Sequence, residues 1–344
     1  MSVGQTFTNL VLGAAALGFL LPVSSSPEAD SRARDFLRTV VGFTDAQIAA
    51  VDSGQIVTRQ LPAADKPDVA AFGAVRLRND GVAFVRRIRR DVGVVSRSPN
   101  IVAVGRFSRP PRVEDLAGLS LEDRDFDVLR ECKPADCHMK LSRSSIERIG
   151  REIDWKAPDA RARASGLLKE MLVAYATAYL HGGTAEMATY ANQERPLDTP
   201  AEFRKLLAAS PYLVTYVPEL HRHLEEFPRA SLAGAEDFLY WSKDTFAPKP
   251  TFSLYHVTTW TDPARGVAVM ASKRIYASHY FQAGLELGIV VAEPEGGYYL
   301  MDLYRARVDP PKGMLAGVVM GKIRGGIERG VSERLKAYAA LETN

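Results

Sequence analysis

Histidine and carboxylate side chains are the residues of this sequence that could carry out acid–base chemistry. Six histidines occur among 344 residues. His256 and His279 lie near tyrosines in strand-like segments, and Asp302 follows in an apolar strand-like segment. If they face one cavity, they would transfer protons as a hydrolase or lyase does, or bind an acidic group. The alternative is structural: hydrogen-bonded histidines, and an aspartate paired with Arg305 or Arg307.

The remaining patterns indicate no cofactor. His221 and His223 stand two apart in an expected helix, so their side chains diverge by about 200° and do not suit one metal ion. The segment 316–322 approaches a phosphate-loop pattern, but Ile323 stands where a magnesium-binding hydroxyl is required. The sequence contains no G-x-S-x-G, H-E-x-x-H or dinucleotide-binding glycine pattern. Whether the protein is an enzyme stays open at this point.

The two cysteines, Cys132 and Cys137, stand close together in the segment ECKPADCHMK. In an oxidising compartment such a lone pair favours a disulfide around a small loop. Free thiols are the alternative. A metal site that includes His138 is disfavoured because no second cysteine pair completes four ligands.

The N-terminal segment predicts export. Residues 10–23 (LVLGAAALGFLLPV) are apolar and precede Ser24–Ser26, which is typical of a signal peptide with its cleavage zone. The run is short for a membrane span, which needs about 20 residues. We therefore expect residues 1–25 to be removed, no transmembrane segment in the mature chain, and a periplasmic or secreted protein of bacterial type. An uncleaved anchor and a misassigned start are the alternatives.

Composition and charge exclude few function classes. The chain is 46% hydrophobic and 25% charged, which is typical of one large or two modest globular domains. A net charge of +3 does not favour nucleic acid as a partner. Nothing in the sequence indicates an oligomeric state.

Alternating strand-like segments dominate the last quarter of the chain. The runs FSLYHVTTW, GVAVMASKRIYASHYFQAGLELGIVV and GGYYLMDLYRARVD are separated by short turns, which predicts an antiparallel meander. A long helix is expected from about residue 312. On it Gly313, Gly317, Gly321 and Gly325 recur at every fourth position. Because a helix-interior glycine costs about 1 kcal/mol relative to alanine, we expect this face to pack closely on the sheet or to line a cavity.

The chain upstream of residue 246 has two parts that differ in their expected secondary structure. Residues 26–143 are expected to form the α+β part of a sheet domain. This part contains strand-like segments at 56–61, 69–77 and 100–107 and a helix at 82–90, and residues 119–129 are expected to be strand or extended. Residues 144–245 are expected to form a mainly helical insert, with helices that include 158–180, 218–227 and 233–243. Residues 246–344 then complete the sheet domain.

This order of elements resembles the helix-grip fold of START-type lipid-binding proteins. The resemblance rests on residues 55–110 and 251–341: strand, helix, strands, helical insert, meander and long C-terminal helix. It implies an α+β fold in which a curved antiparallel sheet wraps the last helix over an apolar cavity.

The function expected from this resemblance is binding of an apolar or lipid-like small molecule between the sheet and the C-terminal helix. The expected ligand contacts are Tyr255, Tyr276, Tyr280, Gly317 and Gly321. Two alternatives stay open. One is a hydrolase or lyase that uses His256, His279 and Asp302 in that cavity, and the other is an interaction domain without a small-molecule site.

Overall fold

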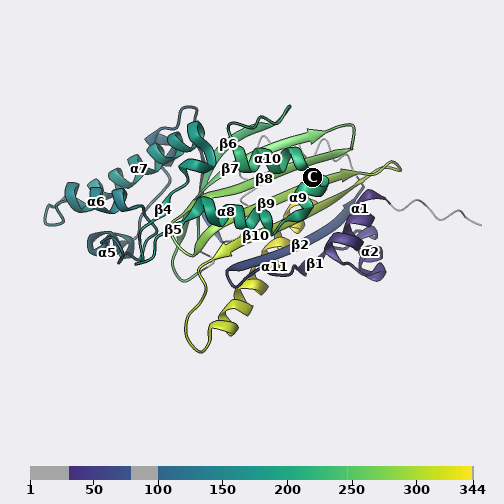
Figure 1. Ribbon diagram of the computed structural model, residues 1–344, viewed down its shortest axis with the longest axis horizontal. Helices are drawn as coiled ribbons and strands as arrows, with labels where there is room; N and C mark the ends of the chain where they lie inside the picture. The colour runs from purple at the N-terminus through teal and green to yellow at the C-terminus, as the bar shows by residue number, and fades with distance from the viewer. Residues whose placement is uncertain (1–30, 79–99, 246, 343–344) are drawn as a thin grey trace, which may run out of the picture.

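Figure 1 shows the computed structural model, which describes residues 31–78, 100–245 and 247–342. The expected signal peptide and the expected helix at 82–90 lie outside the described residues. The expected α+β class is confirmed, since the chain forms a large antiparallel sheet, a mainly helical region and a long C-terminal helix. Among the described helices, none combines the length and the apolarity that crossing a membrane requires.

One eight-stranded sheet organises the chain, in the order β1-β2-β10-β9-β8-β7-β6-β3. All neighbouring strands are antiparallel. Strands β6 to β10 follow one another in both sequence and space, so the expected meander is confirmed. The strands are β1 (Val57–Gln60), β2 (Asp68–Leu77), β3 (Ile101–Arg106), β6 (Glu236–Asp244), β7 (Thr251–Asp262), β8 (Val267–Ala277), β9 (Phe281–Ala292) and β10 (Tyr298–Val308).

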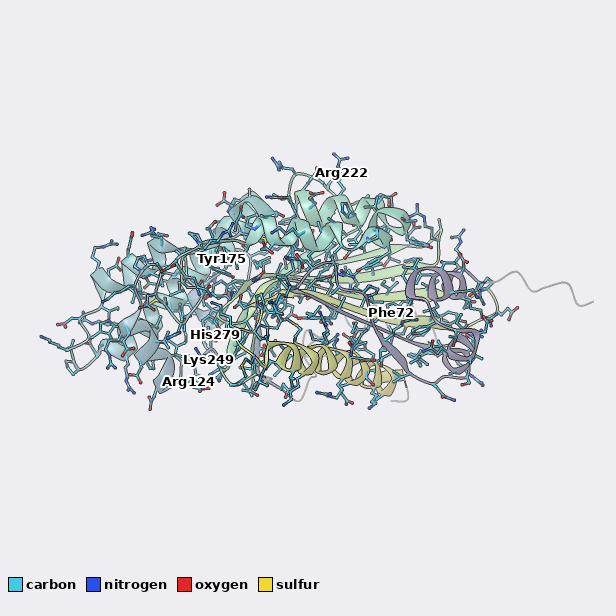
Figure 2. All side chains as sticks on the ribbon, turned by 60° about the horizontal axis from the view of Figure 1, so that its bottom comes forward. Phe72, Arg124, Tyr175, Arg222, Lys249 and His279 are labelled. Carbon is cyan, nitrogen blue, oxygen red and sulfur yellow. A yellow bond between two sulfur atoms is a disulfide. The ribbon has the colours of Figure 1, made fainter. Side chains whose placement is uncertain are left out.

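Helices cover both faces of this sheet. Figures 1 and 2 show α11 on one face and α8 to α10 on the other, while α5 to α7 extend beyond one end of the sheet. The helices are α1 (Arg32–Phe36), α2 (Asp45–Asp52), α5 (Asp123–Glu131), α6 (Arg143–Glu152), α7 (Ala160–Gly182), α8 (Thr199–Ala208), α9 (Pro211–Tyr216), α10 (Pro218–Glu226) and α11 (Ala316–Glu342). A short ribbon, β4 (Thr189–Tyr190) with β5 (Leu197–Asp198), precedes α8.

The predicted secondary structure was wrong for two segments. Residues 119–129 were expected to be strand or extended, but Asp123–Glu131 is helix α5, whose start is capped because the Asp125 carboxylate accepts the Glu122 N–H at 2.8 Å. The expected helix at 233–243 is strand β6 of the main sheet. Its side chains are buried on both faces, so hydrophobic periodicity in the sequence does not distinguish a strand from a helix there. The segment is a strand because its backbone pairs with β7.

The sheet carries a different set of side chains on each face. In β7, Leu254 and Trp260 belong to the main apolar core beneath the helical insert, whereas Val257 belongs to the cluster beneath α11. Lys273 and Arg274 are adjacent in β8, so they point to opposite faces, and both are buried because both faces are covered.

The close approach between α11 and the sheet occurs at a strand glycine. An added Cβ at Gly73 of β2 would lie 2.7 Å from Leu335 Cδ1 and 2.8 Å from Val331 Cγ1. In contrast, Gly317 and Gly321 are exposed, and an added Cβ at either would have no described heavy atom within 4 Å. The expectation that the sheet packs against the glycine face is therefore wrong. The face that packs carries Val331, Leu335 and Tyr338 instead.

This packing predicts opposite effects of two glycine substitutions. Gly321→Ala should raise the free energy of unfolding by about 1 kcal/mol, because it improves helix propensity without a clash. Gly73→Ala should lower it by about 1–3 kcal/mol, because the methyl group displaces buried side chains. Urea unfolding of both variants measures the two signs, and a Gly73→Ala protein as stable as the parent would contradict this account.

Candidate functional site

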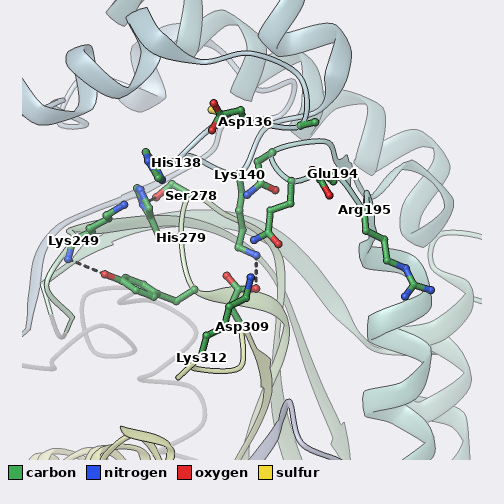
Figure 3. Close-up of a pocket in the computed structure, with 15 residues that line it drawn as sticks. Asp136, His138, Lys140, Glu194, Arg195, Lys249, Ser278, His279, Asp309 and Lys312 are labelled. Atoms are coloured by element: carbon green, nitrogen blue, oxygen red, sulfur yellow. Dashed lines mark hydrogen bonds and ion pairs between the residues drawn. The ribbon is translucent and has the colours of Figure 1, made fainter. Parts of the chain in front are cut away.

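A pocket of about 570 Å³ lies at one end of the sheet, where loops from distant parts of the chain meet. Figure 3 shows its lining side chains. They come from the disulfide loop and the residues after it, from the β4–β5 loop, from the β6–β7 and β8–β9 connections, and from the segment before α11. The lining residues are Ala135, Asp136, Cys137, His138, Lys140, Asn192, Gln193, Glu194, Arg195, Lys249, Ser278, His279, Tyr280, Asp309 and Lys312.

The disulfide loop forms one wall of the pocket. The expected disulfide between Cys132 and Cys137 is confirmed. Within the loop, the N–H of Ala135 donates to the Ala191 carbonyl at 2.8 Å, and the N–H of Cys137 donates to the Asn192 carbonyl at 3.1 Å. These bonds fix the loop against the segment that supplies residues 192–195, so the two walls are held as one unit.

The β8–β9 connection forms the opposite wall. Tyr280 has a φ of 60°, a conformation that is uncommon for a residue other than glycine. The Ser278 carbonyl accepts the Lys140 N–H at 2.8 Å, and the Tyr280 hydroxyl accepts the Lys249 N–H at 2.9 Å. The turn therefore joins the disulfide side of the pocket to the β6–β7 connection. Strained turns at binding sites are held in this way by the contacts around them.

The electrostatics of the pocket are set by cations around His279. Burial, and then the charges of Lys249, Arg124 and Lys140, lower the pKa of His279 to about 4. The ring is therefore neutral at neutral pH. Its Nδ1 lies 2.9 Å from the Ser278 hydroxyl, which also accepts the Phe252 N–H.

Lys140 is the most buried cation of the pocket. Its ammonium donates to Asp309 at 2.8 Å, and burial lowers its pKa although Asp309 opposes that shift. In Figure 3 the side chains of His138, His279 and Lys249 gather at one side of the pocket, whereas Arg195 extends away from them. Within the described ranges Lys249 forms no ion pair, so positive potential lies on the His279 side, where it would attract an anionic group.

The three candidate catalytic residues do not share a cavity in the described structure. His279 lines the pocket. His256 is buried on the face beneath the insert, bonded to Tyr179 and Asp237. Asp302 points to the opposite face, where it pairs with Arg334 of α11 at 2.7 Å. A catalytic centre built from these three residues is therefore not formed, because strand alternation sends His256 and Asp302 to different sides of the sheet.

Of the expected ligand contacts, only Tyr280 lines the pocket. Tyr255 lies beneath α11, stacked on Tyr240 with ring centroids 4.6 Å apart. Tyr276 lies beneath the insert, and its hydroxyl donates to the Lys140 carbonyl at 2.9 Å, so it supports the pocket wall from behind. Gly317 and Gly321 are exposed in the first half of α11 and do not line the pocket.

Sequence reasoning missed most of the basic lining of the pocket. Lys140, Lys249 and Arg195 share no motif, and each comes from a different loop. The one available signal was the position of His138 directly after Cys137, which a disulfide loop would hold at a fixed place.

A second polar cluster lies beneath the insert, away from the pocket. His223 of α10, Asp237 of β6 and His256 of β7 bring two ring nitrogens and one carboxylate oxygen within 4.8 Å of one another. These are the described residues that could hold a metal ion.

Comparisons with known proteins place the chain in no sequence family. No family model matches it, and no curated protein matches it. Among solved structures, it is similar to a STAR-related lipid transfer protein from Xanthomonas axonopodis, with 9% identity and a TM-score of 0.36. The match covers 84% of this chain and 94% of that chain. Similarity at this level does not bear on what this chain binds.

The environment of His279 predicts a pH dependence of stability. Its pKa falls from a usual 6.5 to about 4, so the unfolded state binds more protons between these values. This contribution is fully present above about pH 6.5 and is lost as the pH falls toward about 4, with a size of at most about 3 kcal/mol. Urea unfolding across this range should show a flatter profile for His279→Gln. An NMR titration that gives His279 an ordinary pKa would contradict the prediction.

Proposed function

We propose that the chain is a non-catalytic binding protein whose pocket holds the anionic group of a small molecule. The group is a phosphate or a carboxylate, carried either by a free acid or by the headgroup of a lipid-like molecule. The observation that carries this proposal is the convergence of Lys249, His138 and His279 at one side of a pocket of about 570 Å³.

The basic side chains match an anion chemically. Lys249 supplies a flexible ammonium with three donors, and the neutral His279 ring supplies one N–H donor. Hydrogen bonds to a charged group contribute about 1.5–3 kcal/mol each, more than bonds between neutral groups. Asp136 and Glu194 line other parts of the pocket. They disfavour an anion there, so we place the anionic group on the His279 side.

The polar lining favours a headgroup over an acyl chain. An apolar ligand was expected between the sheet and α11, but the described contact there is made by Val331, Leu335 and Tyr338, which are buried against the sheet. In this proposal a lipid-like ligand binds through its acidic headgroup. A purely apolar molecule would exclude water from the half-exposed Asp309 carboxylate of the Lys140–Asp309 pair and offer it no hydrogen bond in exchange.

Binding assays with the full mature chain test this proposal. Calorimetric titration with inorganic phosphate, with a short-chain carboxylate and with vesicles of anionic or neutral phospholipid separates a free anion from a headgroup. We expect Lys249→Ala to weaken binding about 10- to 100-fold, which corresponds to the loss of one charge-assisted bond. Lys322→Ala serves as the matched control, because Lys322 is exposed on α11 and outside the pocket.

Two results would overturn the proposal. One is tight binding of neutral vesicles with no response to the anionic probes. The other is equal binding by Lys249→Ala and the parent protein. Organic extraction of the purified protein, followed by mass spectrometry, would independently identify any co-purified acid or lipid.

We also propose that the protein is exported to the periplasm or secreted. The apolar run at residues 10–23 supports export, and the Cys132–Cys137 disulfide is compatible with an oxidising compartment.

Intact-mass analysis of protein recovered from its native host tests export directly. The mature chain should lack about 22–30 N-terminal residues, as expected after removal of a signal peptide. Full-length protein in the cytosolic fraction would contradict export without affecting the binding proposal.

A further inference from the structure

Three side chains beneath the helical insert converge on one point from three separate elements. His223 Nε2 lies 3.0 Å from Asp237 Oδ1, and His256 Nε2 lies 2.9 Å from the same oxygen. His223 and His256 are buried, and Asp237 is nearly so, with 17% of its side chain exposed. The cluster shares no residue with the pocket, so this inference stands apart from the proposed function.

We propose that His223, Asp237 and His256 form a binding site for a divalent transition-metal ion, zinc being the best match. Zinc binds imidazole nitrogens at about 2.0–2.1 Å and carboxylate oxygens at about 2.0–2.2 Å. Ligand atoms at these distances lie roughly 3.0–3.4 Å apart when their angle at the metal is between octahedral and tetrahedral. The two nitrogen–oxygen separations are at or just below this range, and all three ligand atoms lie within 4.8 Å of one another.

The outer hydrogen bonds of the two histidines suit metal ligation. His223 Nδ1 lies 2.8 Å from the Ala230 carbonyl, which only accepts, so Nδ1 carries a proton. Its Nε2 faces the Asp237 carboxylate, which in its ionised form also only accepts. This nitrogen must therefore either carry a second proton or share a cation with Asp237. Metal-binding histidines usually donate the other ring N–H to a carbonyl or similar partner, as His223 does here.

The second histidine is held in a comparable way. His256 Nδ1 lies 2.9 Å from the Tyr179 hydroxyl, which is able to accept from it when Nε2 binds a metal. Thr258 donates its hydroxyl to Asp237 Oδ1 at 2.7 Å and orients the carboxylate. The rings of Phe227 and Tyr179 contact His256 and form an apolar wall around the cluster. Such a shell limits solvent access to a bound ion.

A bound ion would connect the helical insert to the sheet. His223 belongs to α10, whereas Asp237 and His256 belong to the neighbouring strands β6 and β7. Three protein ligands leave a fourth position for water or another donor, as in sites that are not purely structural. The expected consequence is a protein whose insert is more resistant to unfolding when zinc is present.

Metal titration of untagged protein, first stripped with a chelator, tests the site. We expect one zinc ion per chain by calorimetry and mass-spectrometric metal analysis, and visible absorption bands when cobalt replaces zinc. Magnesium should not compete, because it prefers oxygen ligands. His223→Gln and Asp237→Asn should each weaken zinc binding by more than about 100-fold, since even loss of a partner that orients a ligand costs 10- to 100-fold.

His221→Gln provides a matched control. It changes a histidine on the same helix that lies outside the cluster, and it should bind zinc as the parent does and keep the zinc-dependent rise in Tm. Absence of stoichiometric zinc or cobalt binding by the parent protein would overturn the proposal and leave a hydrogen-bonded network only. Equal zinc affinity in folded His223→Gln would overturn it as well. If neither substituted protein folds, the cobalt spectrum of the parent decides.

Discussion

The constraint on which this structure depends is that both faces of one antiparallel sheet are covered. Antiparallel sheets commonly leave one face to solvent, and their strands then alternate between apolar and polar residues. Here the insert covers one face and α11 the other, so side chains of both alternating sets are buried. Polar residues on either face must therefore find partners inside the protein, since an unpaired buried charge is costly.

The buried polar pairs follow from this constraint. Beneath α11, Arg334 contacts Asp302 at 2.7 Å and Glu286 at 3.2 Å, so one guanidinium serves two carboxylates. Burial, only partly offset by Arg334, raises the pKa of Glu286 to about 7. On the other face, the buried Lys273 donates to Thr184 and to the Leu224 carbonyl. Its pKa falls to about 7 because burial disfavours the ammonium. These groups hold the layers together and are not available to a ligand.

With both faces occupied, the groups that line the pocket reach solvent at the end of the sheet. The pocket forms there from loops that the strands hold in place, which is the usual division between a rigid scaffold and functional connections. The disulfide loop and the turn at Tyr280 are each bonded to a neighbouring segment, so the basic side chains project from supported backbone. The His223–Asp237–His256 cluster differs, because it lies where the insert meets the sheet and its geometry depends on that contact.

Local patterns by themselves determined the strands of the C-terminal meander, the long helix α7 and the Cys132–Cys137 pairing, because each depends on residues near one another in the chain. The tertiary structure alone decided what each buried face touches. The glycines of α11 looked like a packing face, but the helix turns its other side to Gly73. His223 looked unsuited to metal beside His221, yet folding brings it to Asp237 and His256. Such contacts depend on how the layers stack. The spacing of residues within one helix or strand does not predict which other element will pack against it.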